Sequence, residues 1–209
     1  MTVEIWSDIA CPFCYIGKRR FEGALERFEG KENVKIVWRS FQLDPELETD
    51  PNIPAADSLA AKKGWSKAQA EQAMRYTTEM ASGEGLSYRF DRLVVANTFD
   101  AHRLAHLAGQ FGKQNEAEER LFNAYFCEGK NIADHETLLE IGVALGLDAE
   151  NVKETLASEA FAEAVLQDIH TAQQLQIRGV PFFVFDRKYA VSGAQEGDMF
   201  LQAFRQADV

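Results

Sequence analysis

The chain has 209 residues, of which 46% are hydrophobic, and its formal net charge at pH 7 is −11. This length and hydrophobic content are enough for one large domain or two small ones with a real core. The negative charge argues against nucleic acid and against an anionic membrane as partners, because both would repel an acidic surface.

The N-terminal part is predicted to form a β-α-β unit. Residues 2–7 read as a buried strand, residues 11–28 as a helix, and residues 34–39 as a second strand of the parallel type. No basic segment followed by an apolar run and a cleavage site begins the sequence, which predicts a cytoplasmic protein. No apolar run approaches the roughly 20 residues that a membrane-spanning helix needs.

The middle of the chain is predicted to be an all-helical insertion. Pro45, Pro51 and Pro54 mark an irregular linker, since the residue before a proline avoids the helical conformation. The expected elements after the linker are short helix 58–63, helix 66–82, extended piece 86–90, and helices 97–112, 116–127, 134–145, 148–157 and 159–175.

The C-terminal part returns to strands. A run of apolar residues at 181–185 and a turn at 186–188 predict a hairpin with 189–191, and a last helix follows at 196–204. We expect the two ends of the chain to complete one sheet, so the predicted class is α/β. The predicted domains are residues 1–45 with 176–209, and an inserted helical domain at 46–175.

The stretch Cys11-Pro12-Phe13-Cys14 lies where the first strand passes into the first helix. A sulfur at a helix N-terminus is favoured as a thiolate, because unpaired N–H groups and the helix dipole attract negative charge. Pro12 suits the first helical position. Cys14, one turn further on, could attack a mixed disulfide on Cys11, so the pattern indicates thiol–disulfide exchange.

The cysteines have three other possible roles besides exchange. A zinc site needs four ligands and the chain has no second close pair, although Cys127 and the four histidines could in principle contribute. A structural disulfide between Cys11 and Cys14 would close too small a loop to stabilise much. Two buried, inert cysteines remain an alternative. Exchange requires a thiol that solvent can reach and that lies near the Val180–Pro181 peptide bond.

The second informative motif is Gly179-Val180-Pro181 at the start of a strand. It resembles the cis-proline loop that faces the cysteine pair in thioredoxin-like folds. A cis bond would leave the Val180 N–H and C=O groups free to pair with an extended peptide or a small thiol. The alternative is an ordinary trans proline that begins an edge strand.

Together these motifs resemble the DsbA-like thioredoxin superfamily. The segment Asn97-Thr98-Phe99-Asp100-Ala101-His102-Arg103-Leu104 is similar to the signature of its FrnE-like branch, which is related to 2-hydroxychromene-2-carboxylate isomerases and kappa-class glutathione transferases. The resemblance implies a thioredoxin-like fold with inserted helices in a bacterial, cytoplasmic thiol–disulfide oxidoreductase or disulfide isomerase.

The resemblance also implies roles for single residues. Cys11 would attack, Cys14 would resolve, and Pro12, Phe13, Val180 and the cis proline Pro181 would contact substrate. Asn97, His102 and Arg103 would line or brace the cleft beside the cysteines, although Asn97 is also a good N-cap and the other two could simply fix packing. The implied partners are protein or small-molecule disulfides and thiols, with the chain a monomer or homodimer.

No bound cofactor and no metal are expected, and glutathione is a candidate co-substrate. The main alternative activity is a glutathione-dependent isomerase or transferase of the chromene carboxylate type; those relatives usually carry serine at the position of Cys11, which favours dithiol chemistry here. A non-catalytic binding module is a third interpretation. The apolar ring of Phe13 predicts a reduction potential of about −200 to −230 mV. The basic run Lys18, Arg19 and Arg20 is expected mainly to face solvent, and Cys127 to lie in the core.

Overall fold

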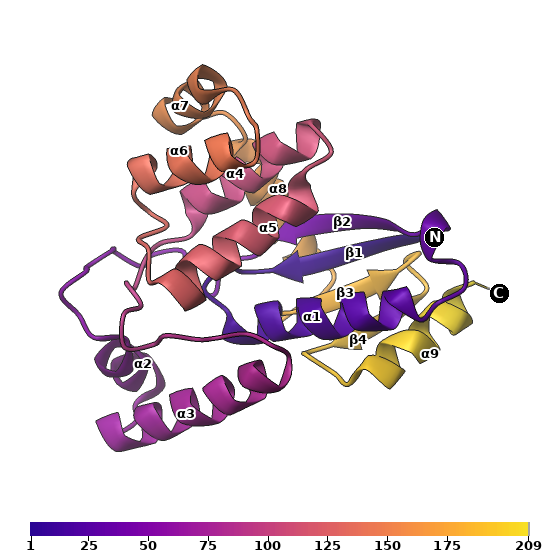
Figure 1. Cartoon of the computed structure of the whole chain (residues 1–209), viewed down its shortest axis with the longest axis horizontal. Helices are drawn as coiled ribbons and strands as arrows, with labels where there is room; N and C mark the ends of the chain where they lie inside the picture. Colours follow the sequence, from indigo (N-terminus) through magenta and orange to yellow (C-terminus); the bar gives the residue numbers. More distant parts are fainter. Residues whose placement is uncertain (209) are drawn as a thin grey trace. The chain divides into compact units, whose positions relative to one another are not determined.

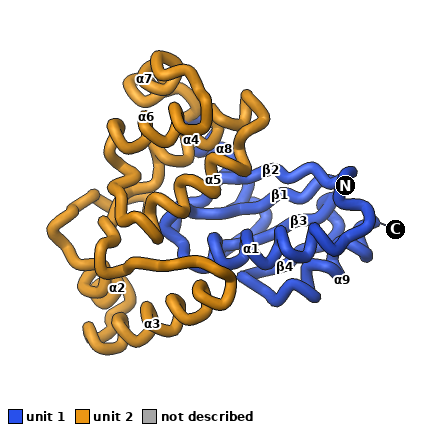
Figure 2. Tube along the Cα trace, in the orientation of Figure 1, with its two compact units in different colours: residues 1–43, 162–209 blue, residues 44–161 orange. Residues whose placement is uncertain are grey.

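The structure, a computed structural model, describes residues 1–208 and divides them into two compact units (Figure 2). Unit 1 contains residues 1–43 and the chain from residue 162 onward, and unit 2 contains residues 44–161. The first boundary lies close to the predicted one. The second lies at 161/162 instead of 175/176, because the helix α8 (Ala162–Gln174) packs on the sheet of unit 1.

Unit 1 is built on a four-stranded mixed sheet with the strand order β2-β1-β3-β4 (Figure 1). The buried strand β1 (Thr2–Ser7) pairs in parallel with β2 (Lys35–Ser40) on one side. It pairs antiparallel with β3 (Phe182–Phe185) on the other, and β3 forms a hairpin with β4 (Tyr189–Ser192). The two ends of the chain thus form one sheet.

Successive side chains of β1 point to opposite faces of this sheet, and each face has its own helices. On one face, α1 (Pro12–Glu26) and α9 (Gly197–Ala207) form an aromatic core in which the Phe21 ring lies 5.4 Å from Phe183 and 5.8 Å from Phe200 between centroids. On the other, the Trp6 indole packs against α8 and donates its Nε1 hydrogen to the Asp168 carbonyl at 3.1 Å. A short turn, η1 (Lys31–Asn33), leads from α1 into β2.

Unit 2 is helical throughout its regular structure. Its elements are α2 (Ala55–Lys63), α3 (Lys67–Gly83), α4 (Phe99–Gln110), α5 (Gln114–Phe122), the π-helix η2 (Asn123–Glu128), α6 (His135–Ala144) and α7 (Ala149–Ala157). Ser66 and Gln69 form a capping box at the start of α3.

The segment 86–90 is irregular, so the extended piece predicted there is not a strand. Its aromatic residues pack on a helix instead of pairing at a sheet edge: the Tyr88 ring stacks on Phe126 at 4.8 Å, and Phe90 meets Phe126 edge-on at 6.1 Å. Alternating apolar residues can thus signal a loop that covers a core as well as a strand.

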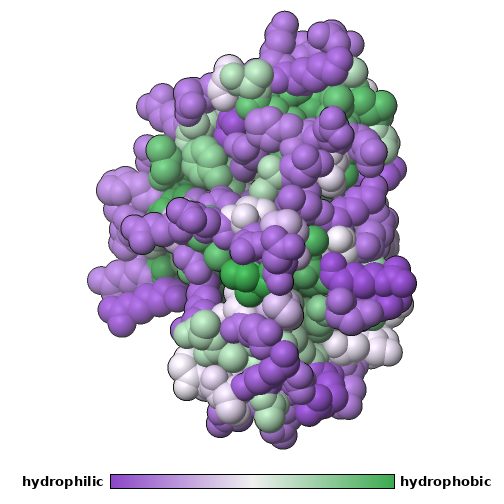
Figure 3. Space-filling view, turned by 90° about the vertical axis from the view of Figure 1, so that its left-hand side faces the viewer, coloured by the Kyte–Doolittle hydropathy of each residue, from purple (hydrophilic) through white to green (hydrophobic). Residues whose placement is uncertain are grey.

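Hydrophilic residues cover most of the face shown in Figure 3, and smaller hydrophobic areas lie between them. This agrees with the acidic composition of the chain. Among residues 1–208, no helix combines the length and the apolar character needed to span a bilayer.

Candidate functional site

The two thiols of the Cys11–Cys14 pair lie where α1 begins, just after the end of β1. Cys11 is the N-cap of α1 and Pro12 occupies its first turn, as the sequence predicted. The Cys11 amide donates to the Asp8 carbonyl at 2.9 Å, and the Cys14 amide donates to the Cys11 carbonyl at 3.0 Å. This places Cys11 at the positive end of the helix dipole.

Asp8 holds the loop that carries Cys11, although no sequence motif singled it out. Its carboxylate accepts the Ala10 amide at 3.2 Å and the Leu43 amide at 2.7 Å, which ties the cysteine loop to the chain that leaves β2. Asp8 is buried. An aspartate in a turn, which can accept the amide two residues on, is the signal that could have identified it.

The Val180–Pro181 peptide bond is cis, and it lies beside Cys11. The Cys11 thiol donates to the Val180 carbonyl oxygen across 3.5 Å. Gly17, on α1, allows this approach, since a Cβ built on it would meet Pro181 Cγ at 2.9 Å. The structure therefore brings Cys11, Val180 and Pro181 together, as the two motifs predicted.

Both thiols are shielded, contrary to the accessible sulfur that the sequence analysis required. Cys11 exposes 4% of its surface and Cys14 exposes 1%, whereas Phe13 between them is 37% exposed and Pro12 is half-buried. The loop that fixes Cys11 by backbone hydrogen bonds also places its side chain under the Val180 carbonyl. The surface next to the pair is thus formed by Pro12 and Phe13.

Burial raises the pKa of the Cys14 thiol well above its ordinary value, and the neighbouring Cys11 raises it further. The Ser7 hydroxyl and the Asp8 amide act in the opposite direction, because each can donate a hydrogen bond to the sulfur. Cys14 is therefore a thiol at neutral pH. All three cysteines of the chain are free thiols, and Cys127 is half-buried on η2 instead of lying in the core.

The basic run that follows the cysteines is not turned to solvent as expected. Lys18 is 2% exposed, and its ammonium group is 2.6 Å from the Glu22 carboxylate one turn along α1. Arg19 stacks its guanidinium over the Tyr15 ring at 5.1 Å, and Arg20 donates to the Ala194 carbonyl at 2.8 Å. These side chains brace α1, so they are structural.

Asn97 and Arg103 each hold the chain of unit 2 together. Asn97 donates to the carbonyls of Pro45 and Leu47 at 3.2 and 3.0 Å and accepts the Phe99 amide at 2.9 Å, which joins the proline-rich linker to the start of α4. Thr98, not Asn97, is the N-cap residue of that helix.

Arg103 is buried and binds the end of α7. Its guanidinium donates to the carbonyls of Thr155 and Ser158, to the Ala160 carbonyl at 2.8 Å, and to the Asp100 carboxylate at 2.8 Å. The last carbonyls of a helix have no partners within the helix, so a buried arginine can satisfy them. His102, its neighbour on α4, is buried as well.

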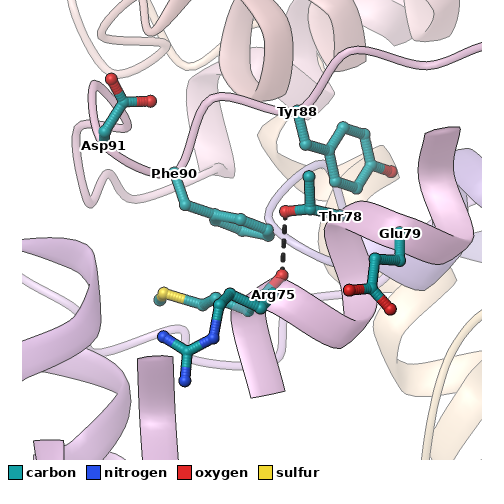
Figure 4. A pocket seen from close by; sticks show the side chains of 7 residues that line it. Arg75, Thr78, Glu79, Tyr88, Phe90 and Asp91 are labelled. Atoms are coloured by element: carbon teal, nitrogen blue, oxygen red, sulfur yellow. Dashed lines mark hydrogen bonds between the residues drawn. The ribbon is translucent and has the colours of Figure 1, made fainter. Parts of the chain in front are cut away.

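Unit 2 also has an open pocket of about 340 Å³ between α3 and the segment after it (Figure 4). The Phe90 and Tyr88 rings and Thr78 border it, with the carboxylates of Glu79 and Asp91 at its rim. None of the predicted site residues lines this pocket. Nowhere in residues 1–208 do three or more His, Cys, Asp or Glu side chains gather as a metal site would require.

Comparison with known proteins gives consistent results over the full length of the chain. A model of the DSBA-like thioredoxin domain matches residues 2–205. A probable DsbA oxidoreductase from Streptomyces coelicolor is 44% identical, with a TM-score of 0.92 and coverage of 99% of this chain and 89% of that one. The uncharacterised protein YwbO of Bacillus subtilis is 27% identical over 203 residues, 96% of this chain and 94% of its own.

Two more distant structures share the fold. The cytosolic disulfide reductase DsbM from Pseudomonas aeruginosa is 17% identical, with a TM-score of 0.69 over 99% of this chain and 98% of its own. A 2-hydroxychromene-2-carboxylate isomerase is 18% identical, with a TM-score of 0.74 over 99% and 95%. At this identity the likeness concerns the fold alone.

Proposed function

Since the chain belongs to the DSBA-like thioredoxin domain family, we propose that it is a thiol–disulfide oxidoreductase in which Cys11 attacks and Cys14 resolves. The observation that carries the proposal is the position of Cys11 at the N-terminus of α1, 3.5 Å from the Val180 carbonyl, with Cys14 one turn further into the helix. The exposed fractions, 4% and 1%, also favour Cys11 as the sulfur that meets substrate.

The exchange proceeds in two steps. The Cys11 thiolate attacks one sulfur of a disulfide R–S–S–R′, forming Cys11–S–S–R and releasing R′–S⁻, which takes up a proton. Cys14 then loses its proton and attacks Cys11 Sγ, so that the Cys11–Cys14 disulfide forms and R–S⁻ leaves. The substrate is reduced and the protein oxidised by two electrons, and the reverse sequence oxidises a dithiol.

We expect the residues that surround Cys11 to contact substrate; these are Pro12, Phe13, Val180 and Pro181. The Val180 carbonyl, expected to be free, accepts from the Cys11 thiol. An extended peptide or a small disulfide could pair with the backbone of Val180 once that thiol has moved away. Because Cys11 exposes so little surface, exchange requires a local movement that uncovers its sulfur. The hydrogen bonds of Asn97 and Arg103 within unit 2 favour a bracing role over contact with substrate. For His102, a role at the site stays a prediction.

We further propose that glutathione is a co-substrate and that the protein acts in the cytoplasm. DsbM offers a precedent within the same fold: it is a cytosolic disulfide reductase, and one of its structures contains glutathione. The Cys14 sulfur distinguishes this proposal from glutathione-dependent isomerisation, since such a reaction needs no resolving thiol.

The test is the fate of a mixed disulfide in cysteine variants. Reduced protein is mixed with a peptide disulfide, quenched with acid and analysed by mass spectrometry. We expect wild type to end as the Cys11–Cys14 disulfide, Cys14→Ser to accumulate peptide on Cys11, and Cys11→Ser to form neither species.

Cys127→Ser serves as the matched control and should behave like wild type. Isomerase activity retained in full by Cys14→Ser, or exchange that survives in Cys11→Ser, would contradict the proposal.

A further inference from the structure

Ser7 is a buried hydroxyl at the end of β1 for which the fold itself offers no bonding partner. It is 1% exposed, and its Oγ has no hydrogen-bond partner within residues 1–208. A buried, unsatisfied hydroxyl costs about 1–3 kcal/mol. Such a group needs an explanation, and its surroundings supply one.

The alternation of β1 and the period of α1 place Ser7 opposite Cys14. Ile5 pairs with Phe183, whose ring stacks on Phe21 of α1, so this face of β1 is the one that α1 covers. Ser7 lies two residues beyond Ile5 and therefore on the same face. On α1, Cys14 lies seven residues before Phe21, two turns back on the same face of the helix.

Gly17 confirms the orientation of that helical stripe. A Cβ on Gly17 would meet Pro181 Cγ at 2.9 Å and Phe183 Cζ at 3.4 Å, so the face that carries Cys14, Gly17 and Phe21 lies against the sheet. The Ser7 hydroxyl accordingly lies on the side of β1 that faces Cys14, and its proximity lowers the pKa of that thiol against the effect of burial.

We propose that Ser7 is a hydrogen-bond donor to the Cys14 sulfur, acting in the step in which Cys14 resolves the mixed disulfide. In that step the proton of Cys14 Sγ passes to the leaving R–S⁻, and Cys14 Sγ, as a thiolate in a buried site, forms a bond to Cys11 Sγ as the Cys11–S–S–R bond breaks. The inference rests on the proposed two-step exchange, and it assigns Ser7 to the second step alone.

The charged side chains near Cys14 have other partners, so Ser7 and the backbone are the groups that can donate a hydrogen bond to the Cys14 sulfur. The Asp8 carboxylate already accepts two amides. The Asp8 amide, like the Ser7 hydroxyl, lowers the pKa of the Cys14 thiol. The Lys18 ammonium, one turn further along α1, is paired with Glu22 at 2.6 Å. Cys11, the remaining titratable neighbour, is bound to substrate during resolution.

The test separates the two steps by rapid mixing, acid quench and mass spectrometry. In Ser7→Ala, we expect the second-order rate of mixed-disulfide formation to stay within twofold of wild type. Resolution should slow about tenfold, which is the effect of losing one hydrogen bond to a charged group, and its pH midpoint should move upward. In a Cys14→Ser background, Ser7→Ala should change nothing.

Ser7→Thr and Ser7→Val form a matched pair of nearly equal shape that differs in the hydroxyl. Thr should resolve faster than Val by a similar factor, even if both are less stable than wild type. Equal resolution rates in Thr and Val, or both steps slowed alike in Ser7→Ala, would overturn the role of Ser7. If wild type itself forms no mixed disulfide, the proposed function fails instead.

Discussion

At the scale of single residues, Gly17 and Gly23 lie on the same helix but differ in the space available for a side chain. Gly17 lies where α1 approaches the Val180–Pro181 bond, and a Cβ there would meet Pro181, Phe183 and the backbone of Ala194 within 3.5 Å. Gly23 has nothing within 4 Å of its virtual Cβ. Glycine is therefore required for packing at the first position and is simply a weak helix former at the second.

We expect Gly17→Ala to destabilise the protein by about 1 kcal/mol, because overpacking at Pro181 outweighs the gain in helix propensity. It should also slow disulfide exchange, since Pro181 and Val180 must shift relative to Cys11. Gly23→Ala, the control, should stabilise by about 0.5–1 kcal/mol and leave exchange unchanged. Urea denaturation and a peptide-disulfide assay measure both; a Gly17→Ala protein as stable and active as wild type would contradict the close approach.

At the scale of elements, the sequence predicted what local patterns determine and missed what depends on packing. The cysteine pair at the head of α1 and the Gly-Val-Pro strand follow from turn chemistry and apolar runs, and both are found. The placement of α8 with the sheet depends on Trp6 and Asp168, which are distant in sequence from each other. The shielding of Cys11 and the roles of Asp8 and Ser7 likewise depend on which segments meet.

Arg103 shows how an element boundary is fixed within unit 2. Replacing it with lysine removes the planar guanidinium that binds carbonyls in the last turn of α7 and just after it, so we expect Arg103→Lys to cost roughly 2–3 kcal/mol of the free energy of unfolding. The reduction potential should not change, since the guanidinium bonds described are to α7 and Asp100.

The matched control is Arg89→Lys, in an exposed pair with Asp91. It should change stability by about 0.5 kcal/mol or less. A normal stability for Arg103→Lys together with a shifted potential would indicate instead that Arg103 acts at the dithiol.

At the scale of the whole molecule, the acidic chain buries one of its carboxylates in unit 1 among cations. Glu4 is 5% exposed; Arg39 binds it at 2.8 Å and also binds Asp168 at 3.0 Å, and Arg187 binds it at 2.9 Å. Burial alone would raise the pKa of Glu4, but the hydrogen bonds and charges of Arg187 and Arg39 outweigh burial and hold the pKa below its ordinary value of 4.5.

This depressed pKa makes Glu4 a source of acid sensitivity. Its contribution is fully present above pH 4.5, the unfolded value, and is lost as pH falls through the lower, folded pKa. We expect Glu4→Gln to lower stability at pH 7 by about 1–2 kcal/mol and to flatten the loss of stability at acid pH.

Urea denaturation from pH 3 to pH 8 would show this. Glu26→Gln, in an exposed pair with Lys31, is the control and should follow wild type at all these pH values. An unchanged acid limb in Glu4→Gln would contradict the assignment.

The measurement that tests the central claim most directly is the redox titration of Cys11 and Cys14 in glutathione buffers, followed by alkylation and mass spectrometry. The account predicts a single two-electron transition to a Cys11–Cys14 disulfide at about −200 to −230 mV, unaffected by Cys127→Ser. Thiols that stay reduced across the whole range of buffers, or a Cys11 that stops at a glutathione adduct in wild type, would contradict it.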